Sequence, residues 1–410
     1  MTPSATATHP PGAALDPKWA KLPQMLAGAG LLLAVIGAFV NTKQFAHSYL
    51  LAFMFFLSLC LGGLFLTLVH HLFDASWSVA TRRVTEHMAW LLPVMFFLFI
   101  PIAVLAPKFI YEWMRLDPHV DHALHAKQPV FSLGGFYAIA AGLFVVWTGL
   151  VYALRSHSLA QDKTGAALHT FKMRFHSGYG IFLFAITLTL AAIMWVKALE
   201  HQWFSTMYGV YYFAESVWTT CATLWVITAL LTRTGHLKPV VTKNTLHCIG
   251  LLWFAFTVFY AYIHFSQYFL QWNANLPEET FWYVKREQGS WWDIGMLIVF
   301  GHFLIPFLLL LRIDAKLNPT LIIPLAAWAW IMHYCDLSFN IMPVLHPDGF
   351  VLHWIDLGCL AFIGGVLALV FIKYLKAHPA YPLKDPRLGE CIGVHGPHPQ
   401  HPAPASGGHH

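Results

Sequence analysis

The chain has 410 residues, a formal net charge of +5 at pH 7, 58% hydrophobic residues and only 10% charged residues. Soluble domains contain about 25% charged residues, so this composition excludes a soluble globular protein and indicates a membrane protein. Lysine and arginine are enriched on the cytoplasmic side of membrane proteins. The positive net charge is therefore no argument for a nucleic-acid partner.

The first 21 residues are polar and rich in proline and alanine. We expect residues 1–21 to form a cytoplasmic tail, because no small-residue cleavage site follows an apolar core as in a signal peptide. Ten apolar segments follow, and the length of each is close to the roughly 20 residues that a helix needs to cross a bilayer. They cover residues 22–40, 49–72, 88–106, 131–154, 178–198, 210–231, 246–270, 292–313, 320–340 and 352–376. Residues 377–410 are rich in proline, histidine and glycine, and we expect a disordered cytoplasmic tail.

These segments predict an all-α, polytopic membrane protein with about ten transmembrane helices. The second and sixth segments begin and end alike, which favours two related four-helix bundles at residues 46–198 and 210–340. Helices 22–40 and 352–376 would flank the pair, although shared membrane constraints alone would also produce the likeness. An even number of helices places both termini on the same side of the membrane. On that side lie 17 of the 24 Lys and Arg residues. We therefore predict that both termini are cytoplasmic.

The sequence carries few signs of a redox cofactor. Its six cysteines form no C-x-x-C pattern, so we expect no c-type haem and no iron–sulfur cluster within this chain. A b-type haem needs two axial histidines at one depth. His247 and His264, separated on one helix by about 25 Å, do not meet this need. Single histidines on different helices keep a b-type cytochrome open as an alternative.

Three carboxylates lie inside the predicted spans, namely Glu215, Asp336 and Asp356. An ionisable group at the bilayer centre costs about 2.5–3.5 kcal/mol on insertion scales, so each is a functional candidate. The motifs "HYCD" and "HWID" place His333 and His353 three residues before Asp336 and Asp356. Residues three apart share a helix face, so each pair could form one acid–base unit that titrates near neutral pH. Alternatively, the two members of each pair only form hydrogen bonds with each other near the lipid headgroups.

A polar stripe marks the seventh predicted helix. Tyr260, His264, Gln267 and Gln271 follow a helical spacing on an otherwise apolar segment, and lipid cannot satisfy their hydrogen bonds. His302 lies near the middle of the eighth segment, where it is either hydrogen-bonded in the bundle or part of a relay. The candidates for a proton path or quinone site are Glu215, His264, His302, His333, Asp336, His353 and Asp356. We predict no catalytic residue and no metal ligand.

Three stretches carry a resemblance to a known family: "HSYLLAFMFFLSLCLGGLFLTLVHHLFDASWSVATRRVTEHMA", "YIHFSQYFLQWNANLPEETFWY" and "FGHFLIPFLLLLRIDAK". They resemble the NrfD/polysulfide-reductase type of integral membrane subunit. More narrowly, residues 20–376 resemble the two such subunits of alternative complex III, a bacterial quinol:cytochrome c oxidoreductase. The length fits the shorter, ActF-type subunit rather than the ActC-type.

The resemblance implies a subunit in the bacterial inner membrane that supports quinol oxidation and conducts protons, without being catalytic alone. It implies a sister NrfD-type subunit, a periplasmic iron–sulfur subunit, multihaem and monohaem cytochromes c and a terminal oxidase as partners, within membrane lipids. Haem and iron–sulfur clusters would belong only to those partners. This chain would bind no covalent cofactor, and its ligand would be menaquinol or another quinone. The alternatives are a purely structural membrane anchor, a b-type cytochrome subunit and a secondary transporter.

Overall fold

The structure, a computed structural model, describes residues 18–393. Within this range ten helical spans are long and apolar enough to cross a membrane. They are α1 (Lys18–Val40), α2 (Thr42–Phe73), the run α3–α4–α5–η1 (Val79–Ile110), α7 (Leu133–Thr164), α8 (Leu168–Trp195), α9 (Tyr208–Arg233), α10 (Lys243–Ala274), the run α12–η4–α13 (Ser290–Leu311), α15 with η5 (Pro319–Val344), and α16 (Trp354–Ala377). The prediction of an all-α polytopic membrane protein is confirmed.

Two of these spans are broken into shorter helices. The third consists of α3 (Val79–Ala89), α4 (Leu92–Leu98), α5 (Ile100–Leu105) and the π-helix η1 (Ala106–Ile110), and the eighth consists of α12 (Ser290–Leu297), the π-helix η4 (Ile298–Leu304) and α13 (Ile305–Leu311). Pro93, Pro101, Pro107 and Pro306 each lie in the first two positions of a new piece. Proline lacks the backbone N–H that would continue the preceding helix, which explains the breaks at these four positions. The change from α12 to η4 at Ile298 involves no proline.

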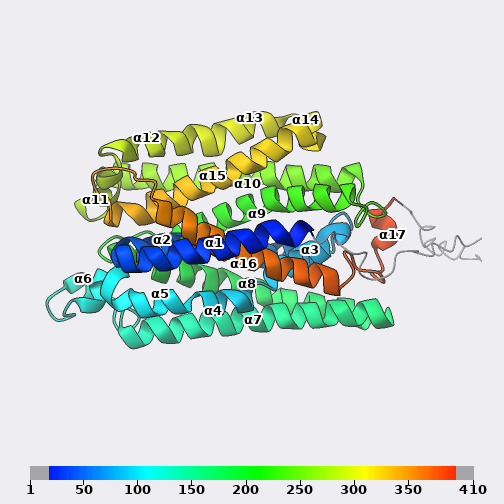
Figure 1. Cartoon of the computed structure of the whole chain (residues 1–410), viewed down its shortest axis with the longest axis horizontal. Coiled ribbons are helices and arrows are strands. Elements are labelled where there is room, and N and C mark those ends of the chain that lie inside the picture. Colours follow the sequence, from blue (N-terminus) through cyan, green and yellow to red (C-terminus); the bar gives the residue numbers. More distant parts are fainter. Residues whose placement is uncertain (1–17, 394–410) are drawn as a thin grey trace, which may run out of the picture.

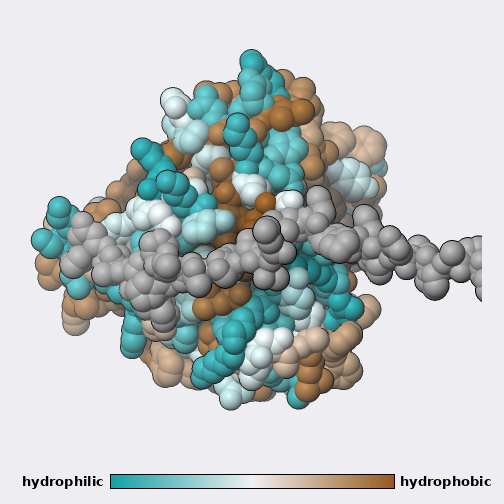
Figure 2. Space-filling model, turned by 90° about the vertical axis from the view of Figure 1, so that its right-hand side faces the viewer, coloured by the Kyte–Doolittle hydropathy of each residue, from teal (hydrophilic) through white to brown (hydrophobic). Residues whose placement is uncertain are grey.

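The remaining elements are short and lie at the two ends of the bundle. They are η2 (Glu112–Arg115), α6 (His122–His125), η3 (Lys197–Glu200), α11 (Pro277–Arg286), α14 (Ile313–Leu317) and α17 (Leu388–Cys391). The spans run along the long axis of the molecule, with α17 at one end and α6 and α11 at the other (Figure 1). We call these the terminal end and the loop end. Figure 2 looks onto the terminal end, where hydrophilic side chains gather between more hydrophobic flanks.

Helices α2 and α9 form the centre of the bundle. In the most apolar window of α2 89% of the residues are buried, against 17% in α1. A helix that is apolar all round is expected to be enclosed by other helices, and α2 fits this description. Gly62 permits the close crossing with α9, because a Cβ at this position would lie only 2.1 Å from Thr220 Oγ1.

The other helices group around this centre. On one side α2 contacts α3, α4 and α8, and α7 packs on α8; on the other side α9 contacts α10 and α15. Helices α1 and α16 pack against each other along their length and against α2. Their contact is close at Gly365, where a Cβ would lie 2.4 Å from the backbone nitrogen of Ala27.

The ends of the chain differ from the sequence-based expectation. Helix α1 begins at Lys18, so residues 18–21 are helical rather than part of a tail. Residues 378–393, assigned by composition to a disordered tail, lie against the terminal end of the bundle. There Asp385 pairs with the buried Arg82, and Cys391 is buried. Composition alone does not show that a charged segment packs on buried arginines. Residues 1–17 and 394–410 lie outside the described residues.

Candidate functional site

The buried polar centre of the bundle is built by α9 and α15. Glu215 lies two turns into α9, and His333 and Asp336 lie on the loop-end half of α15. All three side chains are fully buried. Burying an ionisable group costs free energy unless it is paired and hydrogen-bonded, so the partners of these three groups decide what the site can do.

His333 bridges two helices. Its Nδ1 lies 2.5 Å from Glu215 Oε1, and its Nε2 lies 2.8 Å from the hydroxyl oxygen of Ser58 on α2. Ser58 also donates to the carbonyl oxygen of Phe55 at 2.6 Å. The hydroxyl has one proton to give, to Phe55 or to His333. The imidazole can therefore exchange a proton with a carboxyl group on one side and a hydroxyl group on the other.

Asp336 is held by phenols. Its Oδ1 accepts hydrogen bonds from Tyr211 on α9 and, at 2.8 Å, from Tyr260 on α10. Asn340, one turn further along α15, donates to Tyr211 at 3.2 Å and accepts from Tyr208 at 3.0 Å. Asp336 is thus the centre of a network that joins three helices. The sequence paired His333 with Asp336, but each of them bonds instead to a residue of a neighbouring helix.

Glu215 and Asp336 are electrostatic neighbours in this buried centre. Their second oxygens, Glu215 Oε2 and Asp336 Oδ2, have no hydrogen-bond partner within residues 18–393. Two neighbouring carboxylate anions repel each other, so the two groups favour a state in which one of them is protonated. We call these two residues the carboxyl pair. Such a pair can take up and release a proton as a unit.

His302 lies beside this network without a hydrogen bond to it. It sits in the π-helix η4, fully buried, between the rings of Trp218 and Tyr260, whose centroids are 3.8 and 3.7 Å from its own. Neither ring nitrogen has a hydrogen-bond partner among the described side chains and backbone. π-Helical turns are frequent at functional sites. The stack fixes Tyr260 against Asp336, so His302 acts here as a packing partner of the network.

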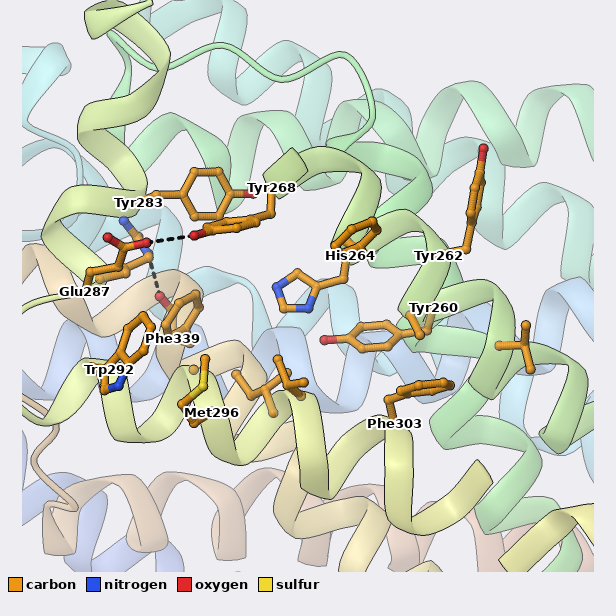
Figure 3. A pocket seen from close by; sticks show the side chains of 17 residues that line it. Tyr260, Tyr262, His264, Tyr268, Tyr283, Glu287, Trp292, Met296, Phe303 and Phe339 are labelled. Carbon is orange, nitrogen blue, oxygen red and sulfur yellow. Dashed lines mark hydrogen bonds between the residues drawn. The ribbon is translucent and has the colours of Figure 1, made fainter. Parts of the chain in front are cut away.

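His264 faces a cavity of about 540 Å³ between α10, α11 and the run α12–η4. We call it the His264 cavity. Its walls are largely apolar and aromatic: they include Val258, Ala261, Phe265, Tyr268, Tyr283, Trp292, Met296, Val299, Phe303 and Phe339. Figure 3 shows the imidazole of His264 pointing into the space opposite Met296, with Tyr260 beside it. Several lining residues are also exposed on the outer surface of the bundle, among them Phe265 and Val299, so the cavity opens sideways toward lipid.

The cavity and the carboxyl pair adjoin each other. The centroid of the His264 ring lies 5.6 Å from that of Tyr211 and 5.7 Å from that of Tyr260. Both of these tyrosines bond to Asp336. One side of His264 thus meets the membrane-facing cavity, and its other side meets the first layer around the buried carboxylate.

Arg286 closes the loop-end side of the cavity. Its guanidinium donates to the carbonyl oxygens of Phe339 at 2.7 Å and Asn340 at 3.1 Å, and it pairs with Glu200 at 3.0 Å. Its centre lies 3.5 Å from the ring of Trp282. A cation is favourable at a helix C-terminus, and this contact anchors the end of α15 that carries Asp336.

Asp356 and His353 belong to a separate cluster at the start of α16. The backbone N–H of His353 donates to Asp356, and the backbone N–H of Ile355 donates to the His353 ring, which together cap the helix. Asp356 also accepts hydrogen bonds from Ser48 on α2 and from Tyr334 on α15. The predicted acid–base unit of these two side chains is instead a helix cap, and no hydrogen bond within residues 18–393 links it to His264 or the carboxyl pair.

The sequence analysis did not predict several residues of the site, namely Ser58, Tyr208, Tyr211, Arg286 and Asn340. On α9 the spacing of Tyr208, Tyr211 and Glu215 does mark one face, so a signal was present there. No such spacing marked Ser58. Helix α2 is apolar on every side, and the sequence does not show which side contacts α15. Among residues 18–393 no group of three or more histidine, cysteine or acidic side chains is arranged to hold a metal ion. The His264 cavity has the size and the apolar lining of a site for a small ligand.

No protein-family model matches the chain, and no curated protein sequence matches it.

Proposed function

We propose that this chain is an integral membrane subunit of a quinol:cytochrome c oxidoreductase complex of the alternative complex III type. In this proposal it lies in the bacterial inner membrane with both termini in the cytoplasm. It binds a quinol in the His264 cavity and supplies a proton route, while the redox cofactors belong to partner subunits. One observation carries the proposal: a lipid-facing apolar cavity ends at a histidine that adjoins a buried carboxyl pair.

The cavity supports a quinone-type ligand by its size and chemistry. Small-molecule sites are concave, largely apolar and about 300–1,000 Å³ in volume, with a few polar groups that fix orientation. The His264 cavity has about 540 Å³ and aromatic walls, and its polar groups include His264, Tyr260 and Arg286. A quinol has a hydroxylated ring on an apolar tail. The sideways opening suits a ligand that arrives from the bilayer with its tail in lipid.

The route for protons begins at His264. Quinol oxidation to quinone releases two protons and two electrons, and the electrons pass to the redox partners. His264 is placed to accept a hydroxyl proton and hand it on toward Tyr211 and Asp336. From Asp336 the carboxyl pair leads to His333 and Ser58 through the contacts described above. The steps from Tyr211 to Asp336, from Glu215 to His333 and from His333 to Ser58 follow hydrogen bonds. The step from Asp336 to Glu215 joins two buried carboxyl groups that interact electrostatically.

The alternatives make different demands on the same residues. A purely structural anchor would use the carboxyl pair and its phenols only to hold α9, α10 and α15 together. A b-type cytochrome would need two histidines that face each other across a haem. Both nitrogens of His333 are engaged, by Glu215 and Ser58, and His302 is covered on both faces by aromatic rings. The site therefore favours proton transfer beside a quinol.

The proposal is tested by quinone binding to the full chain in lipid nanodiscs. We expect a short-tailed quinone analogue to quench the tryptophan fluorescence of the wild type, because Trp292 lines the cavity. His264→Ala should weaken the binding about tenfold, the loss of one good hydrogen bond in an apolar site. His247→Ala, on the same helix but outside the cavity, is the matched control. Equal affinity in both variants, or saturable quenching in neither, would overturn the quinol site.

A further inference from the structure

Two lysines meet at the loop end, away from the cavity. Lys127 lies between α6 and α7, and Lys197 begins η3, directly after α8. Their side-chain amino groups approach the same two phenyl rings and interact electrostatically with each other. Two neighbouring ammonium ions repel each other, and an anion bound between them would relieve this repulsion.

Both amines lie near the same two phenyl rings. Lys127 Nζ is 4.1 Å from the ring centroid of Phe204 and 5.5 Å from that of Phe131, and Lys197 Nζ is 5.5 and 5.9 Å from the same centroids. Lys197 is only 7% exposed. The two amines thus share one aromatic environment, in which Lys197 is largely removed from water. Burial, reinforced by the charge of Lys127, lowers the pKa of Lys197 to about 7.

The nearby carboxylates are engaged elsewhere. Asp121 accepts a hydrogen bond from His201 at 2.8 Å and caps α6. Glu200 pairs with Lys285 and Arg286. Lys127 donates to the carbonyl oxygen of His201, and no ion pair joins either lysine to a carboxylate in the part of the chain that the structure describes. Within residues 18–393 the two lysines therefore keep positive charge that no ion pair neutralises.

The position of the pair indicates the source of an anion. The span α8 ends at Trp195 and the span α7 begins at Leu133, so the lysines lie at the boundary of the predicted membrane. Val130, Leu133 and Phe204 beside them are exposed and apolar. Phosphate groups of phospholipids lie at this depth, and their acyl chains would continue along the exposed apolar residues. We propose that Lys127 and Lys197 bind the phosphate group of an anionic phospholipid.

The proposal predicts that the full chain, purified in a zwitterionic detergent, gains thermal stability from phosphatidylglycerol. Phosphatidylcholine and inorganic phosphate serve as the comparison ligands. For Lys127→Gln/Lys197→Gln the phosphatidylglycerol concentration that gives half of the stabilisation should rise about tenfold or more. Lys43→Gln/Lys108→Gln, which removes two exposed lysines from the same end, should leave it unchanged. Lys127→Arg/Lys197→Arg keeps both charges and should restore binding.

Three outcomes would overturn the assignment. Equal phosphatidylglycerol affinity in the two glutamine variants would show that the lysine pair is no site. An equal effect of inorganic phosphate on the wild type would show that the anion is not a lipid. If the glutamine variant does not fold, the wild type still decides, because binding to a phosphate must weaken as salt rises from low to high concentration. Salt-independent stabilisation would contradict the proposal.

Discussion

His333 Nδ1 lies 2.5 Å from Glu215 Oε1, and this contact joins α15 to α9 at a fully buried position. The other ring nitrogen reaches Ser58 on α2. One imidazole thus connects three helices, including the two that form the centre of the bundle. In the proposed proton route the imidazole lies between Glu215 and Ser58. Under that proposal His333 both connects the helices and carries the proton.

His333→Ala should destabilise the protein strongly. The change removes the partner of Glu215 and leaves the carboxyl group buried without its imidazole. Breaking one side of a buried pair costs about 3–5 kcal/mol. We expect a fall of this size in the free energy of unfolding, measured by denaturant titration in detergent micelles. His353→Ala is the control, since it removes a half-buried histidine that only caps α16, and a similar loss in both variants would contradict a special role for His333.

Asp336→Asn should lower turnover of the assembled complex while leaving its assembly intact. Asparagine keeps the size of the side chain and can still bond to Tyr211 and Tyr260, but it cannot share a proton with Glu215. Positioned proton transfer contributes about a hundredfold or more to a rate, so quinol:cytochrome c turnover should fall by about that factor. Ser338→Ala, a buried change two residues away, should retain activity. Normal turnover of the assembled Asp336→Asn complex would remove the carboxyl pair from the mechanism.

Much of this fold could be predicted from the sequence, because hydropathy depends only on local composition. Hydropathy predicts the ten spans. The free-energy cost of burying a charge made Glu215 and Asp336 candidates for the site. The partners could not be predicted, because a contact between helices depends on how each helix is rotated about its axis. Spacing on one helix suggested that His333 serves Asp336, whereas the packing of α9 places Glu215 beside His333. Likewise, only the three-dimensional structure shows that Asp356 caps α16.

Ala261→Trp should block the His264 cavity without disturbing the core. Ala261 lines the cavity and is only partly buried, so an indole at this position would fill space that the ligand needs. We expect at least about tenfold weaker binding of the quinone analogue, with little change in the melting temperature. Val145→Trp places the same bulk on α7 at a residue that is 72% exposed. If both tryptophan variants bind the analogue like the wild type, the cavity is not the quinone site.

The stability of the lipid-free protein should rise with pH through a contribution of Lys197. Burial lowers the pKa of this amine from its ordinary value of 10.5 to about 7 in the folded state. Between these two values the unfolded chain binds more protons than the folded chain, so the free energy of unfolding increases with pH. Below pH 7 both states are protonated and the penalty for the buried charge is constant. Melting temperatures from pH 6.5 to 9.5 would reveal the rise.

Lys197→Met should flatten this rise, because methionine keeps the apolar length of the side chain and has no charge to bury. Lys108→Met, at an exposed lysine of the same end, should follow the wild type and thereby account for other groups that titrate in this range. Phosphatidylglycerol should flatten the wild-type curve in the same way, since a bound phosphate favours the charged amine. Parallel curves for the wild type and Lys197→Met would show that burial does not lower the pKa of this lysine.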